Sequence, residues 1–201
     1  MKTNAEIVIA GAGMAGVAAA HQLAVREGVA RVVLVDPREP LSLTSSQGTE
    51  GYRNFWPGPD DTMVRFMNRS IDLLDALDRD TGHACETIRR GYVFLPADPA
   101  KAARVRGHES PTTQFIDGGR TIRERYPFVT DRVRAMLHVG RAGFMNAAAL
   151  GRCLLERARA HGVDLVRDEV TELVVHNGRF SAVQLASGSR IDARVFVLAA
   201  G

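Results

Sequence analysis

The residues with the clearest chemistry are three glycines near the start of the chain, Gly11, Gly13 and Gly16, which form a complete G-x-G-x-x-G. In this spacing the first glycine permits a tight turn, the second lets a pyrophosphate approach the backbone, and the third allows a helix to pack closely. The N–H groups at the start of that helix favour a phosphate. Asp36 follows 20 residues after Gly16, where a carboxylate can accept hydrogen bonds from an adenosine ribose. The spacing predicts a dinucleotide-binding site.

Three elements must position these residues, and the sequence predicts each of them. The apolar, β-branched run at residues 7–10 is typical of a buried strand. A helix is expected over residues 14–27, and a second strand over residues 32–35 ends next to Asp36. A strand, a glycine turn, a helix, a strand and an acid in this order are the context that a dinucleotide motif requires.

Bulk composition excludes several other classes of protein. The chain has 201 residues, 45% of them hydrophobic and 24% charged, which is ordinary for a globular protein. The net charge of +3 does not predict nucleic-acid binding. Cys85 and Cys153 are far apart and the six histidines are scattered, so no metal site is expected. No run of 18 apolar residues occurs, so we expect no transmembrane segment and a cytoplasmic location.

The remainder of the chain alternates between loops, helices and strands. Residues 37–60 are rich in proline, glycine and serine but also hold aromatic residues, and we expect an ordered loop that faces a cofactor or substrate. The Asn177–Gly178 pair is a strong hairpin signal. Helices are expected at residues 62–80, 100–107, 120–125 and 146–161, and strands at 91–95, 163–166, 171–176, 179–185 and 195–198.

Together these elements predict an α/β fold with two lobes. Residues 1–76 and 146–201 form a Rossmann-type nucleotide-binding domain with a β-meander. Residues 77–145 leave this domain and contribute one strand and helices to a partial α+β substrate lobe.

Four stretches of the sequence resemble one known family. These are the glycine fingerprint with its acid at residues 11–36, the serine-rich loop at 44–53, the approach to a helix at 142–146, and the apolar strand with its Ala-Ala-Gly end at 195–201. In these stretches the chain resembles the FAD-dependent amine and amino-acid oxidoreductases of the D-amino-acid oxidase, glycine oxidase and sarcosine oxidase type. The resemblance extends over nearly the whole chain, but only over the N-terminal part of a typical member.

The resemblance implies an FAD site and assigns residues to it. The three glycines would contact the pyrophosphate, and Asp36 would hold the adenosine ribose. Ser45 and Ser46 would contact the pyrophosphate–ribityl region. The backbone of Val170 would touch the adenine, and residues 199–201 would lie near the ribityl chain. The cofactor-binding set is Gly11, Gly13, Met14, Ala15, Gly16, Asp36, Pro37, Arg38, Ser45, Ser46, Val170, Ala199, Ala200 and Gly201. Arg53 would approach the flavin ring or hold a substrate carboxylate. Residues 37–53 contain neither His nor Cys, so the FAD is expected to be non-covalent there.

The activity that the resemblance implies is oxidation of a C–N bond. Hydride would pass from the carbon beside the amine of an amino acid or N-alkyl amino acid to the flavin, and the imine product would hydrolyse. Family members continue well beyond the length of this chain, so residues 1–201 alone are expected to be inactive and to need a C-terminal half, in the same or a partner chain.

Two alternatives stay open at the level of sequence. An NAD-dependent Rossmann dehydrogenase shares the glycine fingerprint, although its second half would require further βα units where this chain predicts a hairpin. A non-catalytic FAD-binding subunit is the other alternative.

Overall fold

The structure, a computed structural model, describes residues 2–44, 47–48 and 50–201. The chain divides into two compact units, the first unit (residues 1–48 and 146–201) and the inserted unit (residues 49–145).

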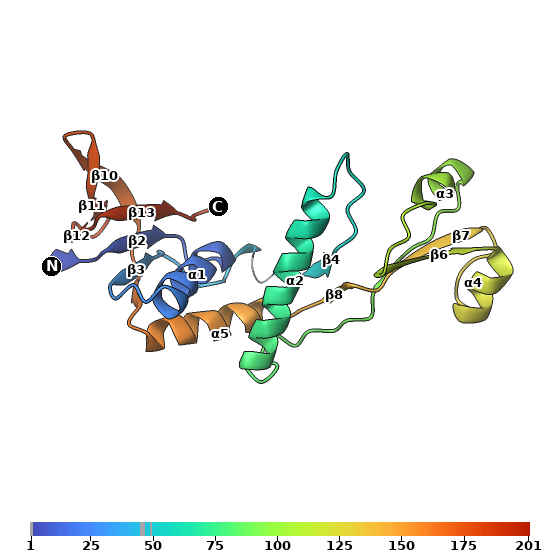
Figure 1. The fold of residues 1–201 in the computed structure, drawn as a ribbon. Helices are drawn as coiled ribbons and strands as arrows, with labels where there is room; N and C mark the ends of the chain where they lie inside the picture. Colours follow the sequence, from blue (N-terminus) through green and yellow to red (C-terminus); the bar gives the residue numbers. More distant parts are fainter. Residues whose placement is uncertain (1, 45–46, 49) are drawn as a thin grey trace. The chain divides into compact units, whose positions relative to one another are not determined.

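The first unit is built on a four-stranded parallel sheet in the order β13-β2-β3-β9 (Figure 1). Its strands are β13 (Val195–Leu198), β2 (Ile7–Ala10), β3 (Val32–Val35) and β9 (Asp164–Val166). All four residues of β3 are buried, as expected for a strand with a neighbour on each side and covered faces. The predicted α/β class with a parallel sheet is confirmed.

Two helices of the first unit pack against one another beside this sheet (Figure 1). They are α1 (Met14–His21), continued by the π-helical turn η1 (Gln22–Arg26), and α5 (Ala147–Ala160). The continuous α-helix expected over residues 14–27 is therefore divided, because the hydrogen-bonding pattern changes from α-helical to π-helical after His21. Asn146 caps α5 as predicted, with its side-chain oxygen accepting the Ala149 N–H at 3.0 Å.

A second sheet of the first unit has four strands in the order β1-β12-β11-β10. They are β1 (Lys2–Asn4), β12 (Arg190–Asp192), β11 (Arg179–Leu185) and β10 (Val170–His176). Strands β10, β11 and β12 form an antiparallel meander, and β1 pairs in parallel with β12. The predicted hairpin is present: Asn177 and Gly178 both have positive φ, as a two-residue hairpin turn requires. Val183 and Leu185 of β11 share a buried cluster with Val33 of the parallel sheet.

The inserted unit contains more strands than the sequence predicted. One strand was expected over residues 77–145, whereas four lie there. The three that were missed have only three to five residues each, and none alternates regularly between polar and apolar residues. An antiparallel sheet has the order β5-β7-β6, and a two-stranded ribbon joins β4 to β8. The strands are β4 (Gly51–Arg53), β5 (Tyr92–Phe94), β6 (Thr113–Asp117), β7 (Ala135–Val139) and β8 (Ala142–Phe144). The expected loop at residues 37–60 thus includes a strand, β4.

The helices of the inserted unit are those the sequence predicted, within one or two residues. They are α2 (Thr62–Asp80), α3 (Pro99–Val105) and α4 (Gly119–Arg125). The inserted unit begins at residue 49, whereas the substrate lobe was predicted to begin at residue 77. Helix α2 lies in the inserted unit, where its side chains pair with Arg89 and Arg141.

In the described part of the chain, no helix has both the length and the apolar character needed to cross a membrane.

Candidate functional site

A pocket of about 650 Å³ lies in the first unit, at the carboxyl ends of β2, β3 and β13. Ligands of open α/β sheets bind at this edge of a parallel sheet. Most of the residues predicted to bind a cofactor line the pocket. They are Gly11, Gly13, Met14, Ala15, Asp36, Pro37, Arg38, Val170, Ala199, Ala200 and Gly201. Residues separated by more than 180 positions are thereby brought to one cavity.

The glycine turn is shaped by close backbone contacts. Gly11 has φ +105°, and a Cβ there would lie 2.3 Å from the carbonyl oxygen of Ala199. A Cβ on Gly16 would lie 1.8 Å from the carbonyl oxygen of Gly11. Gly16 does not line the pocket, and it instead lets α1 rest directly on the turn. Only glycine fits at either position, and the result is the side-chain-free turn that a pyrophosphate requires.

The first residues of helix α1 line this pocket. Gly13 is its N-cap, with φ −72° and ψ −176°, and Met14 is its first residue. The first turn of α1 carries no acidic side chain, and both residues line the pocket. The positive end of the helix dipole therefore faces a cavity in which an anion is favoured.

Asp36 has a second task that the sequence did not reveal. One of its carboxylate oxygens accepts the N–H of Ala12 at 2.7 Å, and the other accepts the N–H of Arg38 at 2.8 Å. The first bond ties the glycine turn to the end of β3. Each oxygen keeps a further lone pair, so a ribose hydroxyl can still be bound.

Other residues that line the cavity were not in the predicted cofactor-binding set. They include Glu39, Leu41, Ser42, Leu43, Thr44, Glu169, Thr171, Glu172, Leu173, Phe196 and Leu198. The first five belong to the loop that was expected to face a cofactor or substrate, and Phe196 and Leu198 belong to the apolar strand that resembles the family. The residues around Val170 had no sequence signal of their own. Glu39 forms an ion pair with Arg167, which follows β9.

Two predicted site residues, Ser45 and Ser46, fall outside the described residues. Arg53 lies on β4 of the inserted unit, with its guanidinium carbon 4.4 Å from the centre of the Trp56 ring. The Trp56 ring N–H also donates to the carbonyl oxygen of Arg53 at 3.2 Å. The role of Arg53 stays a prediction.

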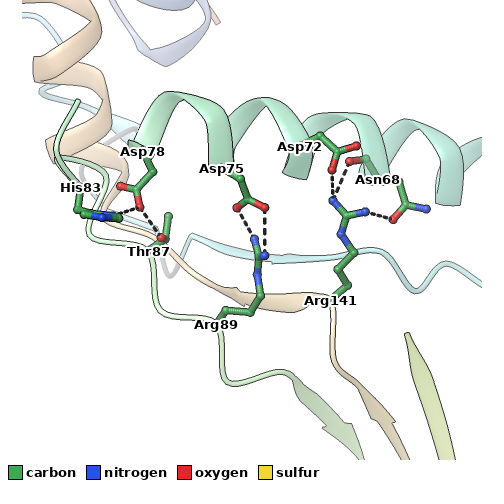
Figure 2. A network of polar contacts seen from close by, with 8 residues as sticks. All are labelled: Asn68, Asp72, Asp75, Asp78, His83, Thr87, Arg89 and Arg141. Carbon is green, nitrogen blue, oxygen red and sulfur yellow. Dashed lines mark hydrogen bonds and ion pairs between the residues drawn. The ribbon is translucent and has the colours of Figure 1, made fainter. Parts of the chain in front are cut away.

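A polar network in the inserted unit fastens α2 (Figure 2). Asp72 pairs with Arg141, and Asp75 pairs with Arg89. The next carboxylate along the helix, Asp78, is buried. All three lie on the same side of α2.

The Asp78 carboxylate is the most heavily hydrogen-bonded of the three. It accepts hydrogen bonds from the His83 ring at 3.0 Å, the Thr87 hydroxyl at 2.9 Å and the Cys85 N–H at 3.1 Å. Burial raises the pKa of Asp78, but these hydrogen bonds outweigh it, so the net pKa is lowered. The network has a structural function, because its groups satisfy one another. Among the described residues, no group of three or more His, Cys, Asp or Glu side chains is arranged to hold a metal ion.

Comparison with known proteins identifies the family. The sequence matches the family model described as "DAO: FAD dependent oxidoreductase" over residues 6–201. No match was found among curated protein sequences.

The structure is similar to several solved structures at low sequence identity. L-proline dehydrogenase from P. horikoshii matches with a TM-score of 0.83 and 22% identity, over 99% of this chain and 53% of that chain. L-amino acid deaminase from Proteus vulgaris, with its specific insertion deleted, matches with a TM-score of 0.84 and 21% identity, over 100% and 54%. Glycine oxidase from Bacillus cereus ATCC 14579 matches with a TM-score of 0.79 and 20% identity, over 98% and 55%.

At these identities the structural likeness shows the fold, and this chain spans about half the length of those proteins. The family model, in contrast, covers nearly every residue from the first strand of the parallel sheet to the end of β13. The resemblance seen in the sequence is confirmed, and the chain belongs to the DAO family of FAD-dependent oxidoreductases.

Proposed function

We propose that the pocket of the first unit binds FAD and that the protein oxidises the C–N bond of an amino acid or N-alkyl amino acid. One observation carries the cofactor part: the glycine turn, Asp36 and the Ala199–Gly201 segment, which are distant in sequence, line a single pocket. Membership of an FAD-dependent family supports the same assignment.

The chemistry of the pocket residues fits the parts of FAD. Gly11 and Gly13 with the start of α1 would receive the pyrophosphate, because both glycines line the pocket without a side chain and the helix dipole favours an anion. The Asp36 carboxylate would accept from the adenosine ribose. Val170 would lie beside the adenine, and Ala199–Gly201 beside the ribityl chain. When bound, the flavin supplies the hydride acceptor for the oxidation, and the protein binds and orients.

The proposal also assigns a separate role to each of the two units. The first unit would act as the FAD-binding domain and the inserted unit as part of the substrate lobe. The solved relatives include glycine oxidase, L-amino acid deaminase and an iminodiacetate oxidase, which supports a carboxylate-bearing amine as substrate. Because this chain spans about half their length, turnover is proposed for a protein of the relatives' full length.

FAD binding is tested by titrating residues 1–201 with FAD and following the quenching of flavin fluorescence, with NAD added as competitor. Saturable FAD binding that NAD does not displace is expected. A protein that binds NAD and leaves FAD unbound would overturn the cofactor assignment.

The substrate class is tested in a protein of full family length that contains these residues. The FAD-loaded protein would be mixed without oxygen with a panel of amino acids and N-alkyl amino acids, and bleaching of the oxidised flavin would be recorded. Bleaching by none of the panel would reject the class.

The proposed role of Arg53 predicts a specific kinetic change in the same protein. Arg53→Ala should raise KM for a carboxylate substrate and leave FAD affinity nearly unchanged, because a cation that holds the substrate would be lost. Arg65→Ala is the control, since Arg65 is an exposed arginine on α2. Equal KM values in wild type and Arg53→Ala would remove Arg53 from the site.

A further inference from the structure

Leu41 has an unusual backbone conformation for its residue type. Its φ is +63°, in the left-handed region that non-glycine residues avoid because it brings the Cβ close to the backbone. The residue is nevertheless buried, with 7% of its surface exposed. Such a conformation persists only where the surroundings hold it, and it is most often found at functional sites. Glu39, Ser42 and Thr44, on either side of it, line the proposed FAD pocket.

Two contacts hold Leu41 in place. Its N–H donates to the carbonyl oxygen of Ala12, in the glycine turn, at 2.9 Å. Its side chain lies on Gly151 of α5: a Cβ on Gly151 would be 2.5 Å from Cδ1, 2.8 Å from Cδ2 and 3.2 Å from Cγ of Leu41. Glycine inside a helix weakens it. The space that Leu41 occupies gives a packing reason for glycine at this position.

We infer that Leu41 and Gly151 form a positioning pair for the FAD pocket. Helix α5 holds the leucine side chain, and the leucine holds its own backbone against Ala12. The spacing between the glycine turn and the segment 39–44 is thereby fixed, so that both walls are in place before the cofactor binds. Pre-arranged walls reduce the ordering cost of binding. This inference rests on the proposed function, since it concerns the same site.

The test is a double-mutant cycle read out as FAD affinity. Gly151→Ala adds a methyl group where Leu41 lies and should weaken FAD binding roughly tenfold. Leu41→Ala removes the side chain and should also weaken it. In the Leu41→Ala background, however, Gly151→Ala should change affinity by about twofold or less, because the clash is gone. Arg152→Ala, an exposed neighbour on α5, is the control and should bind FAD as the wild type does.

Hydrogen exchange in the cofactor-free protein gives a second measurement that does not need FAD. The Leu41 amide should be protected in wild type and Arg152→Ala, and should exchange faster in Gly151→Ala and Leu41→Ala. A wild type that fails to bind FAD would reject the proposed function, while the exchange data would still test the pair.

Two results would overturn the inference. One is Gly151→Ala protein with wild-type FAD affinity, whether or not the Leu41 amide exchanges faster. The other is an undiminished effect of Gly151→Ala in the Leu41→Ala background. If Gly151→Ala does not fold, Leu41→Ala and Leu41→Gly decide the matter. The glycine variant relieves the backbone cost but lacks the side chain, so both should lose affinity, and unchanged affinity in both would overturn the pair.

Discussion

At the scale of a single side chain, Asp36 joins the end of β3 to the glycine turn. Asp36→Ala removes the acceptor for the Ala12 and Arg38 N–H groups as well as the proposed charged acceptor for the ribose of FAD. A hydrogen bond to a charged group is worth about 1.5–3 kcal/mol, so FAD affinity should fall roughly 10- to 150-fold.

The FAD affinity of Asp36→Asn should fall less than that of Asp36→Ala, because the amide keeps one acceptor oxygen. A fluorescence titration of both variants measures the difference. Unchanged affinity in Asp36→Ala would place the ribose elsewhere.

Gly13 and Gly11 should respond differently to a side chain. Gly13 has an extended backbone that valine adopts readily, so Gly13→Val should fold, but its branched side chain would occupy space that the pyrophosphate needs. Gly11→Ala is strained at φ +105° and meets the Ala199 carbonyl, so it should lower the stability of the cofactor-free protein.

Thermal melting and FAD content of the two purified glycine variants separate these effects. Normal FAD content in Gly13→Val would contradict the proposed position of the pyrophosphate.

Residue spacing alone predicted only the pocket residues of one local motif, whereas Val170 and residues 199–201 were predicted from the family resemblance. Gly11, Gly13 and Asp36 are recognisable because their spacing follows from one strand–helix–strand unit. The bond between Asp36 and Ala12, and the contact between Leu41 and Gly151, depend on how distant elements pack. No spacing rule encodes such contacts.

At the scale of elements, the carboxylates on one side of α2 bind this helix to neighbouring segments of the inserted unit. Asp78→Asn leaves one acceptor oxygen for the three donors from His83, Cys85 and Thr87, so it should lower the free energy of unfolding by about 1–3 kcal/mol at neutral pH. Asp80→Asn, at the exposed end of α2, is the matched control. Chemical denaturation of the three proteins measures the difference.

The same substitution predicts a pH dependence. The pKa of Asp78 is lower in the folded protein than in the unfolded chain, so its contribution is complete above the unfolded value of about 3.9 and is lost as the pH falls toward the folded value. The stability gap between wild type and Asp78→Asn should therefore shrink as the pH falls below about 4. A gap that widens below about pH 4 would contradict the hydrogen bonding described.

Helices were easier to predict from the sequence than strands. Helices α2 and α5 carry periodic apolar residues and recognisable caps, which act locally. Strands β6, β7 and β8 were missed because each is defined by its neighbour in the sheet, and their sequences do not alternate cleanly.

For the whole molecule, cofactor binding should appear as stability. A ligand that binds only the folded state at 100 times its Kd adds about 2.7 kcal/mol. Far-UV circular dichroism melts at increasing FAD concentrations should therefore show a rising midpoint for wild type. The melting midpoint of Gly13→Val should not rise with FAD concentration. A wild-type midpoint that does not change with FAD concentration would argue against a binding site that exists only in the folded first unit.

The domain boundary shows what sequence reasoning lacks at this scale. The change from the first unit to the inserted unit at residue 49 lies within the serine-rich loop, whose composition does not mark a single boundary residue, whereas the return at residue 146 is marked by the Asn146 cap. Helix α2 pairs with residues 89 and 141 of the inserted unit, and these ion pairs join segments that are far apart in the chain.

The strands of the parallel sheet are synthesised in an order that differs from their order in the sheet. Strands β2 and β3 emerge early, yet their outer neighbours, β13 and β9, are made only after the inserted unit. At about 5–20 residues per second, the ribosome spends on the order of 5–20 s on that interval. Throughout it the nascent β2–β3 pair has two unsatisfied, apolar edges, which are hazards for aggregation. The inserted unit, whose segments are consecutive, can fold first. The pocket is lined by residues 199–201, so the proposed cofactor could stabilise the nascent protein only after β13 has joined the sheet.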